Sequence, residues 1–212
     1  MSCCQCQGAQ KLFSGRYVKR ELKSYRRKGP RGTTRMLIDA LKAEGVDGDT
    51  LLDVGGGVGA IQHELLKAGA SRAIGADAAT EYLEAAREEA ERQGYADRVT
   101  YRYGDFVEFA GELEPADIVT LDRVICCYHD METLVRLSVE KAGRLYGLVY
   151  PRDTWWTRIG NRFLNLSLWL LRNPFRVFIH SSQAVDALVR QGGFVRRYSR
   201  LTPFWQVVVY GR

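Results

Sequence analysis

The sequence predicts an α/β fold in which a mostly parallel sheet carries helices on both faces and an antiparallel hairpin closes one edge. Between residues 50 and 150, short aliphatic runs alternate with amphipathic segments of helical length, the order that gives parallel strands joined by helical crossovers. After Gly192 and Gly193, the stretches 194–200 and 204–210 meet around Thr202-Pro203, which is typical of a hairpin.

The individual elements follow in chain order from the spacing of apolar residues. Short aliphatic runs predict strands, and apolar residues that recur every three or four positions predict helices. Asp130 is expected to cap the helix after the fourth strand, and Gly143 to close it. The expected strands lie near 50–54, 73–77, 99–103, 117–122 and 144–150, and the expected helices near 59–68, 79–93 and 130–142.

Length and composition are those of a compact soluble protein. The 212 residues, 46% of them hydrophobic, can bury one substantial core. The chain has neither an N-terminal apolar region long enough for a signal peptide nor an apolar run long enough to span a membrane. A cytoplasmic location is therefore the default expectation.

The five cysteines do not form a disulfide framework. Three are crowded at Cys3, Cys4 and Cys6, and two are adjacent at Cys126 and Cys127, so reduced thiols are expected. The first three could hold a soft metal ion, but no second Cys or His cluster stands at zinc-finger spacing. The sequence favours idle thiols there and predicts no metal site.

The most informative stretch is 51–59, in which an aliphatic run ends in Asp53 and is followed by three glycines at alternate positions, Gly55, Gly57 and Gly59. The pattern predicts a buried strand, a tight turn and a helix start, with glycines that let a ligand approach the backbone. The third glycine comes two residues after the second, whereas in a dinucleotide-binding turn it comes three residues after the second. A carboxylate at Asp53 would repel a pyrophosphate and attract an ammonium group. The expected ligand therefore carries an amino group and no diphosphate.

Two more carboxylates follow expected strands. Asp77 comes 22 residues after Gly55, close to the offset at which such folds place an acid on ribose hydroxyls, and Asp105 follows the third strand. Asp77 could instead cap the helix 78–93, and Asp105 the turn that begins at Phe106. Acids at the carboxyl ends of three successive strands favour a ligand site, because open α/β sheets bind ligands there.

These motifs resemble those of the class I S-adenosylmethionine-dependent methyltransferases, whose first motif is acidic-x-Gly-x-Gly-x-Gly. The resemblance covers residues 36–150 and implies a Rossmann-like, seven-stranded methyltransferase sheet, an enzyme, and S-adenosylmethionine as the cofactor. In that family, the Asp105 position receives the adenine amino group, and the end of the fourth strand lies under the methionine portion. The implied cofactor-binding residues are Asp53, Gly55, Gly56, Gly57, Gly59, Asp77, Ala78, Gly104, Asp105, Phe106, Asp122 and Arg123.

The segment Arg16 to Arg35 holds nine basic residues and one acid, a charge of +8 against +6 for the whole chain. Val18, Leu22 and Tyr25 recur at helical spacing, which predicts a basic amphipathic helix that ends near Gly29. Its polar face could simply be solvated over the cofactor cleft, or it could bind an anionic substrate, an acidic membrane surface or RNA.

The segment 151–180 is expected to contain a helix. Its polar residues fall in one narrow stripe on a helical projection, and aromatic and aliphatic residues fill most of the rest. Such a helix must pack into the core, cover a pocket or meet lipid. We expect residues 1–35 to form a cap and residues 36–212 the main domain, with 151–180 as a lid over an apolar acceptor. The expected substrate residues are Tyr17, Tyr25, Trp155 and Trp156.

The resemblance also directs attention to the loop after the fourth strand, which would face the transferred methyl group. His129 is the expected general base and Tyr128 its neighbour at the acceptor, because an unperturbed imidazole titrates near neutrality. A loop histidine beside Asp130 could equally be a surface residue. Some metalloid methyltransferases place a ligand cysteine near the position of Cys126, but the rest of their signature is missing.

The expected acceptor is a small, apolar or aromatic molecule methylated on oxygen or another heteroatom. Phe178-Ile179-His180 ahead of a Ser-initiated helix and the aromatic-rich hairpin are loosely similar to the magnesium-protoporphyrin O-methyltransferases. An RNA methyltransferase that uses the basic helix, and a non-catalytic cofactor-binding module, remain the alternatives. Nucleic acid is not the favoured partner, a peripheral membrane contact is left open, and the oligomeric state is not predicted.

Overall fold

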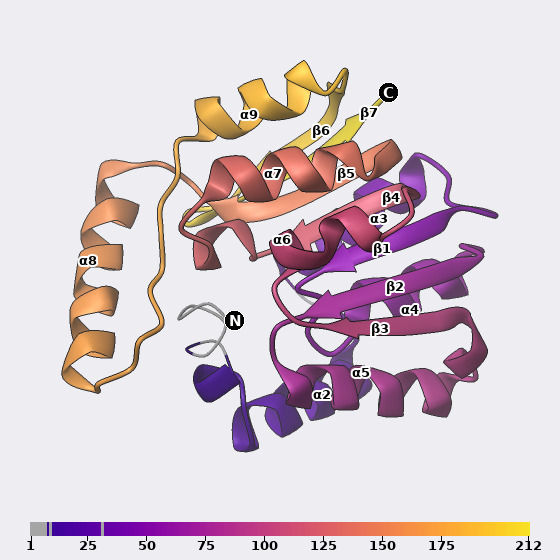
Figure 1. The fold of residues 1–212 in the computed structure, drawn as a ribbon, viewed down its shortest axis with the longest axis horizontal. Coiled ribbons are helices and arrows are strands. Elements are labelled where there is room, and N and C mark those ends of the chain that lie inside the picture. Colours follow the sequence, from indigo (N-terminus) through magenta and orange to yellow (C-terminus); the bar gives the residue numbers. More distant parts are fainter. Residues whose placement is uncertain (1–7, 9, 31) are drawn as a thin grey trace.

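The computed structural model describes residues 8, 10–30 and 32–212. They form one seven-stranded sheet with the order β3-β2-β1-β4-β5-β7-β6 (Figure 1). Strand β7 runs antiparallel to both of its neighbours, and the remaining neighbours are parallel, so the predicted fold class is confirmed. The strands are β1 (Thr50–Val54), β2 (Arg72–Asp77), β3 (Val99–Tyr103), β4 (Ala116–Asp122), β5 (Ala142–Pro151), β6 (Val195–Leu201) and β7 (Trp205–Gly211).

The central strands are buried on both faces because helices cover each side of the sheet. On one face, Leu52 of β1 and Val119 of β4 belong to a core shared with α6 (Phe106–Phe109), α7 (Met131–Glu140) and α9 (Ser182–Gln191). On the other face, Leu51 and Ile118 belong to a core shared with α3 (Thr33–Ala43), α4 (Ala60–Lys67) and α5 (Thr80–Gln93).

The basic helix α2 (Arg16–Lys28) packs outside this second layer. Its buried residues Val18, Leu22 and Tyr25 contact a cluster that includes Val58 and Tyr82. The helix ends at Gly29, which has a φ of 67°, as the sequence predicts. The sequence predicts one helix in this region, and the structure has a second one, α3, after Gly29.

Helix α7 begins as predicted, because the Asp130 carboxylate accepts a hydrogen bond from the Thr133 N–H at 3.1 Å. The prediction that Gly143 closes this helix is wrong. The helix ends at Glu140, and Gly143 lies inside β5 beside an irregularity in the β4–β5 pairing, where a Cβ would lie 3.3 Å from the Ala116 carbonyl oxygen.

Helix α8 (Trp155–Leu170) stands apart from the two helical layers and is followed by an extended segment, 173–180, that leads back to α9 (Figure 1). The side chains of Asn161 and Asn165 donate hydrogen bonds to the Val177 carbonyl oxygen at 2.9 and 2.8 Å, and Asn165 also accepts one from the Val177 N–H. Part of the predicted polar stripe therefore faces inward, toward this segment.

Residues 8, 10–30 and 32–212 contain no helix with the length and hydropathy needed to cross a bilayer. Within the same residues, no group of three or more acidic, His or Cys side chains could hold a metal ion. Cys3, Cys4 and Cys6 lie outside the described part of the chain, so the prediction that they are idle thiols stays a prediction.

Candidate active site

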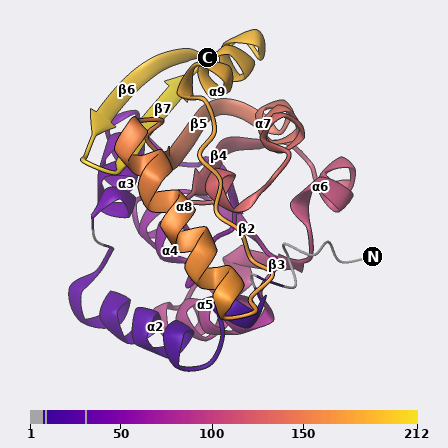
Figure 2. The ribbon, with the colours of Figure 1, turned by 90° about the vertical axis from the view of Figure 1, so that its left-hand side faces the viewer.

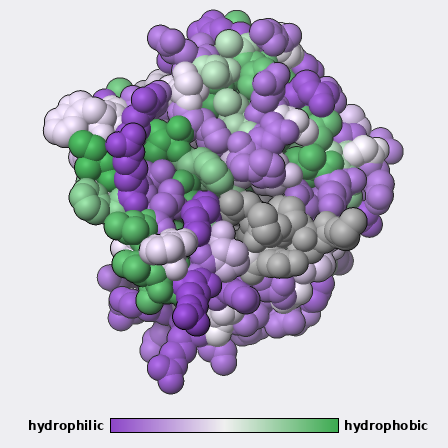
Figure 3. Space-filling model, turned by 60° about the vertical axis from the view of Figure 1, so that its left-hand side comes forward, coloured by the Kyte–Doolittle hydropathy of each residue, from purple (hydrophilic) through white to green (hydrophobic). Residues whose placement is uncertain are grey.

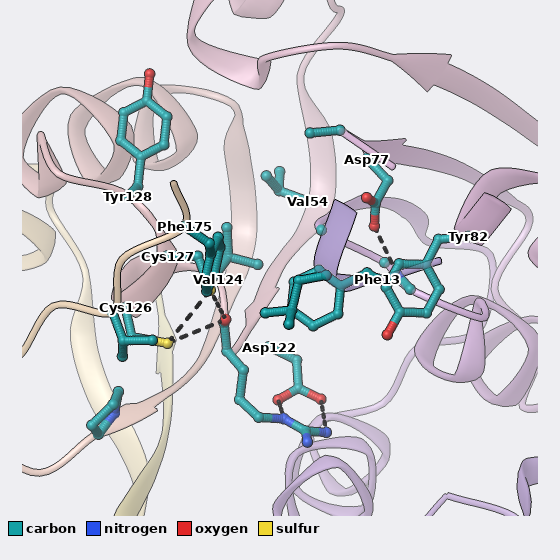
Figure 4. A pocket seen from close by; sticks show the side chains of 18 of the residues that line it. Phe13, Val54, Asp77, Tyr82, Asp122, Val124, Cys126, Cys127, Tyr128 and Phe175 are labelled. Carbon is teal, nitrogen blue, oxygen red and sulfur yellow. Dashed lines mark hydrogen bonds and ion pairs between the residues drawn. The ribbon is translucent and has the colours of Figure 1, made fainter. Parts of the chain in front are cut away.

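A cavity of about 730 Å³ lies at the carboxyl ends of the parallel strands, where open α/β sheets bind ligands. Figure 4 shows Asp77 and Tyr82 on one side of it and Cys126 and Tyr128 on the other, with Phe13 between them. The turn after β1 borders the cavity, and α8 with the segment after it forms another part of the wall.

The glycine turn is built so that its backbone can be approached. Gly55, Gly57 and Gly59 have φ values of 67°, 55° and 77°, a region that L side chains rarely adopt. A side chain at Gly55 would collide with Val124, whereas a Cβ at Gly57 would meet nothing closer than the Tyr82 ring at 3.8 Å. Gly55, Gly56 and Gly57 border the cavity, and Gly59 begins α4.

Asp53 is fully buried beneath this turn. Its two carboxylate oxygens accept hydrogen bonds from the Thr120 hydroxyl at 2.7 Å and from the Gln62 side-chain amide at 3.1 Å. Burial raises the pKa of Asp53 to about 7, and the two hydrogen bonds oppose that rise. Asp53 borders the cavity but has no exposed surface.

Asp77 connects the end of β2 to the glycine turn. One carboxylate oxygen accepts a hydrogen bond from the Gly57 N–H at 3.0 Å, and the other accepts one from the Ala79 N–H at 2.9 Å. Burial raises the pKa of Asp77 to about 6, against the effect of these backbone hydrogen bonds. Asp77 and Ala78 both border the cavity.

Asp105 has two partners. One oxygen accepts a hydrogen bond from the Val107 N–H at 3.1 Å and caps α6, so the capping interpretation of Asp105 is confirmed. The other accepts a hydrogen bond from the Tyr128 hydroxyl at 2.9 Å. Gly104, Asp105 and the buried Phe106 all border the cavity. Asp105 therefore both caps α6 and borders the cavity.

At the end of β4, Asp122 and Arg123 form an ion pair, and Thr34 hydrogen-bonds to both of them. The Arg123 Nε lies 3.1 Å from an Asp122 oxygen, and the Arg123 guanidinium also donates to the Thr34 hydroxyl at 2.7 Å. Thr34 in turn donates to Asp122. Arg123 has a φ of 63°, unusual for a residue other than glycine, and its guanidinium lies 5.9 Å from the centroid of the Trp205 ring. Sequence reasoning missed Thr34, because a threonine at a helix start carries no signal of its own.

The charges around the cavity are mostly negative. The charged side chains that border it are Glu21, Asp53, Asp77, Asp105, Asp122 and Arg123. Within the described chain, Arg123 is the one basic residue at the cavity, and it is paired with Asp122. The basic helix α2 brings no cationic side chain to the cavity, which argues against its binding an anionic substrate there. Helix α2 contributes Tyr17 and Glu21 there, and Glu21 accepts a hydrogen bond from the Tyr82 hydroxyl at 2.6 Å.

The opposite part of the cavity is apolar. Trp156 is fixed by a 3.4 Å hydrogen bond from its indole N–H to the Pro203 carbonyl oxygen and by the Arg152 guanidinium, 5.9 Å from its ring centroid. The apolar residues of this wall are Leu12, Phe13, Trp156, Leu164, Phe175, Val177, Ile179, Phe204 and Trp205.

Three predicted acceptor-site residues lie elsewhere. Tyr25 is buried and its ring stacks on His63 at 6.1 Å between centroids, because the inner face of α2 packs against α4 and α5. Trp155 is 70% exposed and points away from the cavity that its neighbour Trp156 borders. His129 is exposed, stacks on Tyr128 at 5.3 Å, and does not border the cavity, so the structure gives it no position beside an acceptor.

The structure brings the remaining predicted residues together. Of the twelve positions implied by the family resemblance, eleven border this cavity, all but Gly59, and so do Tyr17, Tyr128 and Trp156. Their roles toward a ligand remain predictions. Cys126 and Cys127 also border the cavity. The hydrogen bond with the neighbouring Cys127 thiol, and then burial, raise the pKa of Cys126, which keeps it a neutral thiol.

Comparison with known proteins identifies the domain. Residues 51–141, which include the glycine turn and the four carboxylates at the strand ends, match the model of a family described as a methyltransferase domain. Residues 51–141 therefore form a methyltransferase domain, and the chain has the fold of S-adenosylmethionine-dependent methyltransferases. This confirms the family that the sequence motifs resemble.

Solved methyltransferases share this fold over nearly the whole chain. Magnesium protoporphyrin IX methyltransferase from Synechocystis PCC 6803, with bound SAH, aligns with a TM-score of 0.75 at 17% identity, over 98% of this chain and 99% of that one. An O-methyltransferase family protein from Burkholderia thailandensis aligns with a TM-score of 0.69 at 15% identity, over 96% of this chain and 62% of that one. At such identities the likeness shows the fold alone.

Ribosomal protein L11 methyltransferases are similar over a shorter stretch. The protein from Salmonella arizonae is 37% identical over 71 residues, 34% of this chain. The protein from Photobacterium profundum is 26% identical over 121 residues, 55% of this chain. The methyltransferase chain described here spans only 24% and 39% of the lengths of these two relatives, so their acceptor is not evidence about its own.

Proposed function

We propose that this chain transfers the methyl group of S-adenosylmethionine to oxygen or another heteroatom of a small, apolar or aromatic acceptor. The observation that carries the proposal is the division of the cavity into two parts. Carboxylates and an open glycine turn form one part, and the apolar residues of α8 and the segment 173–180 help to form the other. The first part suits a cationic cofactor and the second an uncharged acceptor.

The residues of the first part fit the cofactor. Negative side chains favour a ligand that bears a sulfonium and an ammonium group, and a Cβ placed at Gly57 would meet no atom closer than 3.8 Å, so a ligand can approach the turn there. Asp77 would accept hydrogen bonds from the ribose, Asp105 would face the adenine, and Asp122 would face the methionine portion. When bound, the cofactor supplies a methyl group that is already activated by its positive sulfur.

The residues of the second part would exclude water and align the acceptor. Alignment alone lowers the barrier of a reaction between two bound molecules, and the proton that a hydroxyl acceptor loses would pass to a carboxylate that borders the cavity. In this proposal, the N-terminal cap and the 151–180 lid close over the acceptor, with Tyr17, Tyr128 and Trp156 at its surface. Carboxylates border the cavity, and its one described basic residue, Arg123, is paired with Asp122. This charge distribution favours an acceptor that is uncharged near the atom that receives the methyl group.

The two alternatives fit the site less well. An RNA methyltransferase would need its basic surface to lead into the cavity, but the exposed basic residues of α2 do not border it. A binding module without turnover would not need an apolar wall beside the cofactor residues. A cavity of about 730 Å³ is in the range of small-molecule sites.

Two measurements test the proposal. Calorimetry with S-adenosylmethionine and with its demethylated product should show binding of both. Release of demethylated cofactor is then measured with a panel of phenols, carboxylic acids, thiols and tetrapyrroles, including magnesium protoporphyrin. Turnover with one apolar member supports the proposal. Binding of NAD in place of S-adenosylmethionine would overturn it, and binding without turnover on any acceptor would favour the non-catalytic module.

A further inference from the structure

Helix α8 turns a continuous apolar surface away from the protein. At about 100° per residue, six apolar residues and Arg162 fall on one side of the helix, and all are exposed. We call this the outer face of α8: Trp155, Ile159, Phe163, Leu166, Trp169 and Leu170, together with Arg162. Figure 3 shows hydrophobic side chains gathered at this side of the molecule.

The outer face has no role in the core. Within α8 only Thr157 and Leu168 are buried, and the inward side is fixed by the polar contacts of Asn161 and Asn165 with Val177. Core packing, one of the three expectations for this helix, is therefore wrong for most of its apolar residues. A solvated helix normally shows the reverse arrangement, with polar residues outward.

The charges around the outer face are positive. Arg162 and Arg172 form no ion pair with any residue in the described part of the chain, whereas Arg158 is paired with Asp153. Helix α2 lies on the same side of the molecule (Figure 2), and its exposed Lys19 and Lys23 are likewise without ion pairs to described residues. A second copy docked symmetrically on this face would bring these positive charges close to their own counterparts.

We propose that the outer face of α8 docks this protein onto the surface of an anionic lipid bilayer. Apolar residues would enter the boundary between headgroups and acyl chains, and the arginines would reach lipid phosphates, as in interfacial helices. Trp155 and Trp169 stand near the two ends of the helix, and tryptophan favours this boundary. The bilayer covers the apolar surface and complements the positive charge at once.

The docked orientation places the cavity beside the bilayer. Trp156, Gly160 and Leu164 border the cavity from the inward side of the same helix. If the proposed function holds, a lipophilic acceptor dissolved in the bilayer would reach the cavity along α8 without crossing water. Docking itself does not depend on that function, because it uses only the outer face.

The test is sedimentation of the full-length protein with vesicles of phosphatidylcholine and phosphatidylglycerol in equal parts, and with vesicles of phosphatidylcholine alone. Leu166→Glu places a charge in the outer face, and Val195→Glu makes the same charge change at a distant strand residue of similar exposure, 48% against 51%. We expect binding to the mixed vesicles that Leu166→Glu weakens about tenfold or more, while Val195→Glu does not. Both variants should keep the thermal unfolding midpoint and cofactor affinity of the parent, which shows that the fold and the cofactor site are intact.

Three results would overturn the proposal. They are no binding to the mixed vesicles, equal binding to both kinds of vesicle, or equal weakening by the two substitutions. A dimer in analytical ultracentrifugation that Leu166→Glu dissociates, with no vesicle binding, would assign the face to a second copy. Vesicle binding by a protein that fails to turn over any acceptor would support docking and contradict only the proposed function.

Discussion

Asp77 is the residue at which the proposed hydrogen bonds to the ribose would compete with structural ones. Its carboxylate already accepts from Gly57 and Ala79, so an added ribose would share these oxygens. Asp77→Asn keeps the shape and removes the charge and one acceptor oxygen. We expect affinity for S-adenosylmethionine to fall about tenfold to hundredfold, measured by calorimetry. The exposed Asp97→Asn is the control, and unchanged affinity in Asp77→Asn would remove Asp77 from the site.

We expect Asp53 to make cofactor binding depend on pH. Its pKa of about 7 in the free protein lies above the ordinary value of 3.8, so the free protein holds a proton there below neutrality. A bound cation favours the ionised carboxylate, so the complex holds fewer protons and forms more readily as the pH rises through 7. Affinity should therefore increase between about pH 6 and about pH 7 and level off above that, and Asp53→Asn should remove most of the increase. A pH dependence identical in parent and variant would contradict this assignment.

Folding carries the opposite dependence at the same residue. Because the folded-state pKa of Asp53 is raised by burial, its contribution to stability is full below about pH 4 and is lost as the pH rises through about 7. The cofactor offsets this loss where it binds. A buried acid that opposes folding without a ligand is a common property of functional sites.

His129 illustrates a sequence prediction that the structure does not support. The loop position is where the family resemblance puts a base, but the side chain is exposed and outside the cavity. We now expect His129→Ala to keep kcat within about threefold of the parent, far from the hundredfold or larger loss of a general base. A larger loss in kcat, with cofactor affinity retained, would restore His129 as the base.

At the scale of elements, α8 can be tested with two adjacent tryptophans. Trp156 borders the cavity and is 41% exposed, whereas Trp155 faces solvent and is 70% exposed. Trp156→Ala should raise the KM for the acceptor about tenfold, because an aromatic surface that covers the acceptor is lost. Trp155→Ala is the matched control and should leave KM unchanged in the absence of membranes. Equal effects of the two substitutions would argue against a lid.

The strands and most helices could be predicted because their causes are local. Aliphatic runs such as 51–54, the glycine turn and the Asp130 cap each act within a few residues of sequence. The orientation of amphipathic helices could not be predicted in the same way. The polar stripe of α8 could be recognised from the sequence, but the direction that it faces could not. Part of it faces inward because Asn161 and Asn165 hydrogen-bond to the Val177 backbone, in a segment without secondary structure. Tyr25 is a second example. Its helical spacing with Val18 and Leu22 predicts a buried face, and that face packs against α4 and α5, so the Tyr25 side chain does not reach the cavity.

At the scale of the whole molecule, charge is divided between two surfaces. The segment Arg16 to Arg35 has a charge of +8 and the whole chain +6, so the rest of the chain is slightly acidic. The charged residues around the cavity are mostly carboxylates. The exposed side of α2 attracts anions over a distance set by ionic strength. The cavity attracts a cation at short range. An anionic polymer would therefore meet the protein at α2, away from the cavity.

This division leads to the prediction that separates a small-molecule enzyme from an RNA methyltransferase. Binding to single-stranded RNA should be weak, independent of sequence, and steeply reduced by salt, because phosphate contacts with α2 would supply the affinity. The triple variant Lys19→Gln, Lys23→Gln, Arg27→Gln should lower the slope of log K against log salt by about 0.7 for each contact removed. The control is Arg72→Gln, Arg197→Gln, Arg200→Gln, the same charge change at exposed residues away from α2, and its slope should match that of the parent. Tight binding to one RNA that persists at moderate salt and survives the α2 substitutions would require base contacts that the apolar wall of the cavity does not offer, and would turn the assignment toward RNA.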